Sequence, residues 1–123
     1  MTRFLLTLEQ ATELIDWAYG FDSSHGKIAI PKIKSLKITD IAKSLGRAYG
    51  NDNIRLKYVG IRPGEKLHEA MISEAESFRT EDYESYFMIT DSIIGNKPWQ
   101  FSSDWSLMES SETDNFLKQS KVI

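Results

Sequence analysis

Two opposite charges flank a rigid turn near the middle of the chain. Residues 59–71 read VGIRPGEKLHEAM, in which Arg62 and Glu65 enclose Pro63 and Gly64. A turn requires the proline and the glycine, but it does not require the two charges. An arginine guanidinium presents a planar fork of donors that matches phosphate oxygens, and a carboxylate accepts hydrogen bonds from sugar hydroxyls. The pattern therefore suits a phosphorylated sugar or a nucleotide.

The same four residues also fit a plain surface ion pair, and from the spacing alone that alternative is the more common one. Arg3 lies next to an apolar run and also allows two interpretations. It is either an ordinary charge near the N-terminus, which is the more common case, or a second cation that contacts the same anion. His68 lies among the charged residues that follow the turn and fits a solvated side chain better than a catalytic one.

Composition excludes several classes of protein. The chain has 123 residues, of which 41% are hydrophobic and 27% charged, so it suits one small globular domain. It has no cysteine and two isolated histidines, which excludes a disulfide framework and argues against a zinc site. No apolar run approaches the length of a membrane span, and the first residues lack the pattern of a signal peptide, so we expect a cytoplasmic protein.

The charges are unevenly distributed along the sequence. The net charge is −3, but residues 1–62 carry a net charge of +4 and residues 63–123 one of −7. The first part could attract a small anion. It is too weakly basic for a nucleic-acid surface, because no stripe of Arg and Lys interleaved with aromatic residues is present.

The start of the chain predicts a helix followed by a strand. Residues 7–20, TLEQATELIDWAYG, place apolar residues at helical spacing, and Thr7 with Gln10 forms the sequence of a capping box. Residues 27–32, KIAIPK, read as a short strand that Pro31 ends.

The next stretch predicts a second helix and a second strand. Residues 35–50 read as a helix, with Thr39 as its cap and Gly50 as its stop. Residues 53–61, NIRLKYVGI, alternate with a period of two, which favours a strand that ends just before the charged turn. In α/β folds, ligands bind beyond such a strand end, so Arg62 is expected there.

The second half is less regular. Residues 65–72 favour a short helix, with a strand as the alternative, and residues 73–85 read as an acidic loop. Residues 86–90, YFMIT, are a strand candidate, whereas residues 91–111 show no clear period. Residues 112–120 suit a short terminal helix. The expected fold is a small α/β (α+β) lobe in which helices cover a short sheet.

Several segments together resemble one family, the extended short-chain dehydrogenase/reductases that make UDP-linked deoxysugars. The nearest branch resembles the polysaccharide biosynthesis UDP-N-acetylglucosamine 4,6-dehydratases and related epimerases. The pieces occur in family order and cover most of residues 1–92, which makes the set specific. They are MTRFLLTLEQATELI, GKIAIPKIKSLKITDIAKSL, VGIRPGEKLHEAMISEAE and, more loosely, YFMI and FSSD.

The resemblance covers only the C-terminal, substrate-binding part of such enzymes. The family binds NADP through a Gly-x-x-Gly-x-x-Gly loop and uses a Tyr-x-x-x-Lys pair as acid and base. The seven glycines here form no such triplet, and none of the five tyrosines is followed four residues later by lysine. The resemblance thus implies NADP in the complete enzyme but no cofactor, metal or catalytic residue in this chain, which we expect to be inactive alone. Met1 matches an internal methionine of the family motif, so we expect a cloned piece, a truncated product or half of a split enzyme.

The resemblance also assigns residues. Arg3 and Arg62 match the arginines that meet the UDP diphosphate, and Glu65 matches the acceptor for the ribose hydroxyls. Ser102 and Ser103 lie where the family closes over the sugar. The expected division is a UDP-sugar-binding lobe at residues 1–92 and a tail at residues 93–123.

The hypothesis is therefore the UDP-sugar-binding portion of a 4,6-dehydratase or epimerase in capsule, O-antigen or flagellar glycan biosynthesis. Its partners would be a UDP-sugar and a Rossmann half in the same or a separate chain, with self-association through the exposed docking face and without nucleic acid or membrane. Two alternatives remain at this point. One is a stand-alone interaction module that keeps the fold without ligand or activity. The other is an unrelated α+β domain that makes no contact with UDP.

Overall fold

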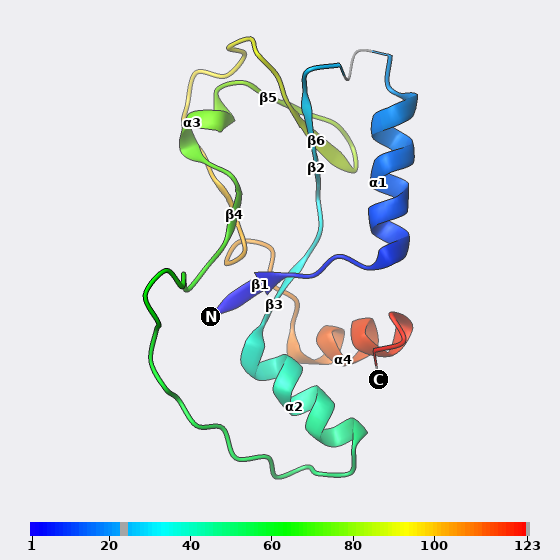
Figure 1. The fold of residues 1–123 in the computed structure, drawn as a ribbon, viewed down its shortest axis with the longest axis vertical. Helices are drawn as coiled ribbons and strands as arrows, with labels where there is room; N and C mark the ends of the chain where they lie inside the picture. Colours follow the sequence, from blue (N-terminus) through cyan, green and yellow to red (C-terminus); the bar gives the residue numbers. More distant parts are fainter. Residues whose placement is uncertain (23–24, 123) are drawn as a thin grey trace. The chain divides into compact units, whose positions relative to one another are not determined.

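The computed structural model describes residues 1–22 and 25–122, and the chain divides into two compact units (Figure 1). Each unit is assembled from segments that are far apart in the sequence. Unit 1 comprises Met1–Leu5, Lys34–Glu69 and Ser103–Ile123. Unit 2 comprises Leu6–Ile33 and Ala70–Ser102.

Unit 1 joins two short strands to two helices. Strand β1 (Thr2–Phe4) pairs antiparallel with β3 (Ser35–Lys37), and helix α2 (Ile38–Ala48) follows β3 directly. Helix α4 (Ser110–Gln119) packs on α2, as Figure 1 shows. The apolar core of this unit is formed by Leu36, Met108 and Leu117, which are buried.

A polar contact joins the two helices of unit 1. The Asp114 carboxylate of α4 accepts hydrogen bonds from the Ser44 hydroxyl and the Arg47 guanidinium of α2. The Ser44 hydrogen bond and then the Arg47 contact hold the pKa of Asp114 below its usual value. At the edge of the same unit, Lys34 lies 2.8 Å from a carboxylate oxygen of Glu112 and lowers the pKa of that residue.

Unit 2 is built around a three-stranded antiparallel sheet. Strand β6 (Tyr86–Ile89) lies between β2 (Ile28–Pro31) and β5 (Thr80–Asp82). Beside this sheet, β4 (Ala70–Ile72) pairs with β7 (Phe101–Ser102). Side chains from these two sheets form the apolar core of the unit: Ile72, Met88, Ile89 and Phe101.

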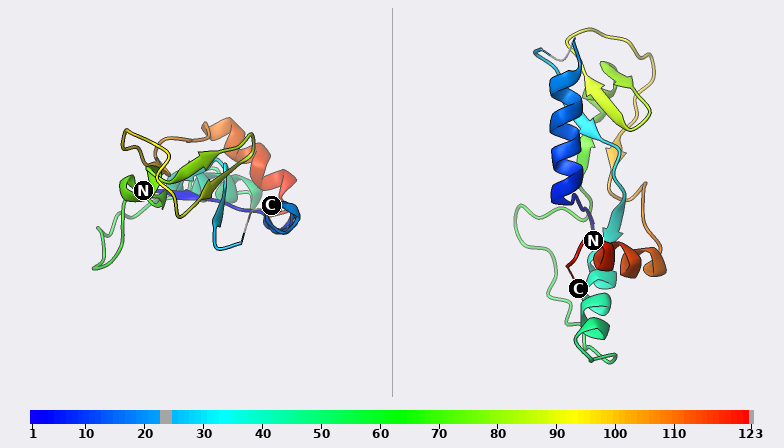
Figure 2. Two further views of the ribbon diagram at one scale, coloured as in Figure 1. Left: turned by 90° about the horizontal axis from the view of Figure 1, so that it is seen from above. Right: turned by 90° about the vertical axis from the view of Figure 1, so that its right-hand side faces the viewer.

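Helix α1 (Leu8–Gly20) begins and ends where the sequence predicts (Figure 2). The Thr7 hydroxyl accepts a hydrogen bond from the Gln10 amide at 3.1 Å, and the Gln10 side chain accepts one from the Thr7 amide at 3.0 Å, so the capping box is confirmed. Trp17 stacks on Tyr86 of the sheet with ring centroids 4.5 Å apart. This aromatic contact joins the helix to the sheet, and none of the residues of the helix is fully buried.

Strands β2 and β6 and helix α4 also confirm their predictions, and the fold is a mixed α+β lobe as expected. The compact units follow contacts within the chain and do not test the division of function at residue 92, which stays a prediction.

The start of the second helix was predicted wrongly. Residues 35–37 form strand β3, and α2 begins at Ile38 with Lys37 as its N-cap, so Thr39 is not the cap. Pairing with β1 draws these residues into an extended conformation and overrides the helical spacing of their side chains. The predicted stop is confirmed, because Gly50 has a φ of 75°, which glycine adopts without strain.

The acidic stretch at residues 73–85 is not a loop. It contains the short helix α3 (Glu74–Ser77) and strand β5. Ser73 and Glu76 form a second capping box, a signal that the acidic composition concealed. The hydrogen bonds from Ser73 also lower the pKa of Glu76.

The prediction for the stretch around the charged turn was also wrong. Residues 53–61 form no strand, because no described strand pairs with them, and residues 65–69 form no helix. The alternative of a strand after the turn is confirmed in part by β4. From the end of α2 to β4 the backbone runs as an irregular segment, visible in green in Figures 1 and 2. Arg62 therefore does not end a strand, and the argument that placed it at a sheet edge fails.

Candidate functional site

The charged turn has a defined backbone conformation. The amide of Glu65 donates a hydrogen bond to the carbonyl of Arg62 at 3.0 Å, which closes a four-residue turn. Gly64 has a φ of 86°, and Pro63 precedes it, as a type II turn requires. The turn therefore follows from its own four residues, and it fixes the relative position of the backbone of Arg62 and that of Glu65.

The two charges do not pair with each other. The Glu65 carboxylate accepts a hydrogen bond from the backbone amide of Arg62 at 2.9 Å, which orients this carboxylate across the turn. The salt bridges between residues that the structure describes include neither Arg62 nor Glu65. Among these residues, no acceptor bonds to the Arg62 guanidinium, so the plain ion pair considered from the sequence does not form.

The turn lines a pocket of about 490 Å³ in unit 1. Arg62, Glu65 and Lys57 contribute its charged groups, and most of the other lining residues are apolar. The remaining lining residues are Met1, Ile38, Thr39, Ala42, Leu56, Tyr58, Val59, Gly60, Ile61 and Leu67. Two basic residues and one acidic residue thus belong to the lining of a largely apolar pocket, which is a common composition for small-molecule sites.

Lys57 is a pocket residue that the sequence analysis missed. The alternating pattern assigned it to one side of a strand, opposite Leu56 and Tyr58. The backbone here is irregular, so residues 56–62 all contribute to the same pocket. The charge itself was a signal that could have identified Lys57, because a cation five residues before Arg62 can serve the same anion.

The structure places Arg3 in a different set of contacts. Its guanidinium donates hydrogen bonds to the carbonyls of Thr2 at 2.7 Å and Lys66 at 3.0 Å, and it lies 3.2 Å from a carboxylate oxygen of Glu69. Arg3 does not line the pocket. The structure thus brings Arg62 and Glu65 together, while Arg3 holds the segment that follows them.

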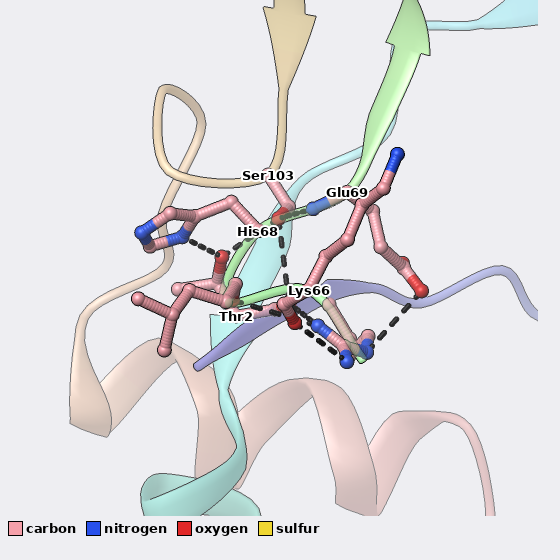
Figure 3. A network of polar contacts seen from close by, with 7 residues as sticks. Thr2, Lys66, His68, Glu69 and Ser103 are labelled. Carbon is pink, nitrogen blue, oxygen red and sulfur yellow. Dashed lines mark hydrogen bonds and ion pairs between the residues drawn. The ribbon is translucent and has the colours of Figure 1, made fainter. Parts of the chain in front are cut away.

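Two hydroxyl groups without a predicted structural role belong to the same set of contacts. Thr2 and Ser103 are buried, and their hydroxyl oxygens lie 2.7 Å apart. The Thr2 hydroxyl also lies 2.7 Å from Nδ1 of His68 (Figure 3). Short polar residues at a strand end and in an aperiodic stretch carry no periodicity signal, so their meeting could not be read from the sequence.

Neither a metal centre nor a membrane span emerges from the residues that the structure describes. Residues 1–22 and 25–122 contain no group of three His, Asp or Glu side chains placed to hold a metal ion. Within the same ranges, no helix has the length and apolar character needed to cross a membrane.

Comparison with known proteins identifies the family. The model of a polysaccharide biosynthesis protein family matches residues 1–91. The chain belongs to this family. The resemblance to extended short-chain dehydrogenase/reductases is confirmed, and an unrelated α+β domain is excluded.

Among relatives of this polysaccharide biosynthesis chain is the inverting UDP-N-acetylglucosamine 4,6-dehydratase of Campylobacter jejuni. The two are 45% identical over 94 residues, which is 76% of this chain and 26% of the dehydratase. The UDP-glucose 4-epimerase of Rickettsia bellii is 33% identical over 90 residues, which is 72% of this chain and 26% of the epimerase. The chain therefore spans about a quarter of the length of these relatives.

The fold agrees with that of a solved relative. The X-ray structure of Pen from Bacillus thuringiensis matches with a TM-score of 0.82 and 25% identity. The match covers 100% of this chain and 39% of Pen. The fold of this chain thus corresponds to a part of Pen, and its sequence is related to a nucleotide-sugar dehydratase and to a polysaccharide biosynthesis family.

Proposed function

We propose that the pocket beside the charged turn binds the UDP part of a UDP-sugar. Arg62 contacts the diphosphate, Glu65 accepts hydrogen bonds from the ribose hydroxyls, and the apolar lining receives the uracil ring. The chain would supply this binding to a complete dehydratase or epimerase that makes a nucleotide sugar for capsule, O-antigen or flagellar glycans. In that enzyme the chain binds and orients the sugar.

One observation carries the proposal. Arg62 is one of the residues that line the pocket, and its guanidinium has no acceptor among the described residues, while the neighbouring Glu65 carboxylate accepts a hydrogen bond within the turn. A guanidinium forms its strongest hydrogen bonds with anionic oxygens, and a diphosphate offers several of them. Lys57 adds a second positive charge to the same pocket.

Arg3 is proposed as the second diphosphate contact. To bind a phosphate oxygen, it would have to give up one of its present hydrogen bonds. Its guanidinium now donates to the carbonyls of Thr2 and Lys66. A phosphate oxygen would have to replace the Lys66 carbonyl, whereas the contact with Glu69 could persist because it uses Nε. Arg62 is therefore expected to contribute more to the affinity than Arg3.

The complete enzyme would use NADP, which supplies hydride transfer at C4 of the sugar. The glycine loop and the Tyr-x-x-x-Lys pair that serve this chemistry are not in the present sequence. We therefore expect the chain by itself to yield no 4-keto sugar from UDP-N-acetylglucosamine and NADP. Detection of that product from the pure protein would contradict the assignment of a binding role alone.

The test is a titration of the chain with UDP, followed by backbone amide chemical shifts. We expect saturable shifts at residues 56–67 with millimolar affinity, because solvent screens the charges of an exposed site. Arg62→Met keeps much of the stem and removes the guanidinium, so it should weaken binding by about tenfold or more. Arg55→Met is the matched control, because Arg55 is in the same segment but does not line the pocket.

Equal losses in the two arginine variants would show only a general effect of charge and would overturn the assignment of Arg62. The absence of saturable shifts in the unaltered chain would overturn UDP binding itself.

The role of Glu65 can be tested separately. Glu65→Gln preserves an oxygen that can accept the hydrogen bond from the Arg62 amide, so the turn should persist. The variant should weaken UDP by about tenfold and 2′,3′-dideoxy-UDP much less, because charge-assisted hydrogen bonds are the stronger ones. If both nucleotides lose equally, Glu65 does not contact the ribose.

A second candidate function is an interaction module without ligand. The observation that favours it is the exposure of large apolar side chains in the same segment, where Tyr58 is 82% and Val59 is 74% exposed. Such side chains suit a protein interface as well as a uracil ring. Failure of UDP to bind, together with self-association that substitutions at these two residues abolish, would favour this candidate.

A further inference from the structure

The segment that carries the charged turn is attached to the rest of unit 1 near its two ends. At the start, the Asn51 amide bonds to the carbonyl of Gly46 at 2.8 Å. At the other end, the Thr2 amide bonds to the carbonyl of Leu67 at 2.8 Å, and the Ser103 amide bonds to that of Glu69 at 2.8 Å. Between them, described residues 55–64 make no hydrogen bond to another element. The position of the turn therefore depends on how firmly residues 66–69 are held.

Side chains reinforce the attachment at residues 66–69. The Glu69 amide donates to the Ser103 hydroxyl oxygen at 2.8 Å, and this oxygen lies 2.7 Å from the Thr2 hydroxyl oxygen. The Thr2 hydroxyl in turn lies 2.7 Å from Nδ1 of His68 (Figure 3). The hydroxyl groups of Ser103 and Thr2 thus link the backbone amide of Glu69 to the imidazole ring of His68. Thr2 belongs to strand β1, at the start of the sequence.

Only two arrangements of the hydrogen atoms satisfy this chain of contacts. The Glu69 amide must donate to Ser103, since an amide has no other role. In one arrangement Ser103 donates to Thr2, and Thr2 donates to a bare Nδ1 of His68. In the other, Nδ1–H donates to Thr2, Thr2 donates to Ser103, and Ser103 donates to the Thr2 carbonyl, 3.3 Å away. Either tautomer of the imidazole is thus accommodated without an unpaired buried hydroxyl.

The hydroxyl groups of Thr2 and Ser103 are buried, so their hydrogen bonds contribute more to holding residues 66–69 than exposed ones would. Thr2 is 3% exposed and Ser103 is 0% exposed, so water cannot take over a lost hydrogen bond. A second contact holds Ser103 itself, because the hydroxyl of Ser35, in strand β3, donates to its carbonyl at 2.5 Å. We call the hydroxyl groups of Thr2 and Ser103, with the residues 66–69 that they hold, the anchor. The anchor is attached to the paired strands β1 and β3, whereas the turn is in an irregular segment.

The anchor is directly connected to the wall of the pocket. Leu67 lines the pocket, and its carbonyl is the acceptor for the Thr2 amide. Met1 lines the pocket as well and adjoins Thr2 in the chain. We propose that Thr2 and Ser103 are positioning residues, whose hydroxyl groups fix residues 66–69 and thereby the Arg62–Glu65 turn for the nucleotide. This inference rests on the proposed UDP binding, but the anchoring it describes can be measured without a ligand.

The decisive variant is Thr2→Val, which replaces the hydroxyl by a methyl group of similar size and keeps the backbone hydrogen bonds. Thr2→Ser retains the hydroxyl and serves as the rescue. Thr113→Val is the matched control, because Thr113 is a fully buried threonine of α4 in the same unit, whose hydroxyl donates to the Glu109 carbonyl. Each variant is measured by amide hydrogen exchange without ligand and by UDP titration.

We expect Thr2→Val to accelerate exchange in residues 60–69 and to weaken UDP binding about tenfold, with Thr2→Ser close to the unaltered chain. Thr113→Val should leave both readouts for this segment unchanged. Ser103→Ala should reproduce the effect of Thr2→Val, and the double variant should lose little more, because both residues belong to one chain of hydrogen bonds.

The outcomes separate the two proposals. If Thr2→Val accelerates exchange in residues 60–69 no more than Thr113→Val does, the positioning role is wrong, whether or not UDP binds. If exchange responds but the unaltered chain shows no saturable shifts with UDP, the positioning role of Thr2 and Ser103 stands and the proposed ligand is wrong. If UDP binds and Thr2→Val leaves its affinity unchanged, the hydroxyl groups do not position the nucleotide contacts.

Discussion

Strand β6 and residues 54–61 both contain residue types that favour strands, but only β6 forms one. The strand reads YFMI, and the segment reads IRLKYVGI, so both are rich in β-branched and aromatic residues. β6 lies between β2 and β5 and has a hydrogen-bonded neighbour on each side. Residues 54–61 have no described strand beside them, and their backbone is irregular.

The difference shows that an alternating pattern indicates compatibility with a strand but not the existence of a partner. A strand is stabilised by hydrogen bonds to its neighbours and by packing of its faces, and both are supplied by other segments. Residues 28–31 and 80–82 supply them to β6. In residues 54–61 the apolar side chains of Leu56, Tyr58, Val59 and Ile61 remain exposed, and these residues line a pocket instead.

The prediction with the largest expected effect tests whether the side chains of β6 are packed and those of residues 54–61 are not. Met88 of β6 is 0% exposed, so Met88→Ala should reduce the free energy of unfolding by about 2–5 kcal/mol. Val59→Ala, in the unpaired segment, should change it by less than about 0.5 kcal/mol, because little apolar surface is buried there. Urea denaturation of both variants measures the difference. A comparable loss at Val59 would mean that the segment is packed in solution.

The next prediction concerns the apolar side chains that have no partner strand. We expect the chain to self-associate, and Val59→Lys should raise the dissociation constant by about tenfold, since it adds a charge to an apolar contact. Ile93→Lys is the control, because Ile93 is 83% exposed in a loop of unit 2. Sedimentation at increasing concentration measures both. A monomer at every concentration, or an equal effect at Ile93, would refute an interface at this segment.

The third prediction compares the starts of helices α1 and α2, and its expected change in stability is smaller. Thr7→Ala removes the hydroxyl that accepts from the Gln10 amide and should cost about 1 kcal/mol of stability. Thr39→Ala, at the residue predicted to cap α2, should cost less than about 0.5 kcal/mol, because α2 starts before it without a side-chain cap. The two variants are compared by thermal and urea unfolding. Equal costs would show that Thr39 stabilises the helix in another way.

The smallest effect concerns the contact between α2 and α4. The Ser44 hydrogen bond and the Arg47 charge lower the pKa of Asp114 in the folded protein. A lowered pKa adds stability above the pKa of the unfolded chain, and this stability is lost as pH falls through the folded value. The gain should be below about 1 kcal/mol, because the group is partly exposed.

Asp114→Asn removes the titrating group of this contact. The stability difference between the unaltered chain and this variant should therefore be constant near neutral pH and shrink below about pH 4. Unfolding by urea at a series of pH values measures it. A difference that grows as the pH falls would contradict the lowered pKa.

The sequence alone determined the features that depend on neighbours within a few residues. The capping box of Thr7 and Gln10 and the stop at Gly50 follow from local hydrogen bonds and from the freedom of glycine at positive φ. The turn from Arg62 to Glu65 belongs to the same class, because its proline and glycine select the backbone conformation. Arg62 and Glu65, two of the three charged residues of the pocket, could be found for this reason.

Only the tertiary structure decided which distant groups meet. Arg3 donates to the Lys66 carbonyl, and the hydroxyls of Thr2 and Ser103 adjoin each other although about a hundred residues separate them. Nothing in their spacing records these contacts, since they arise when β1 pairs with β3 and the chain returns beside it. For the same reason residues 53–61 misled the prediction. Their pattern was suited to a strand, but a strand needs a second segment, and that is a property of the fold.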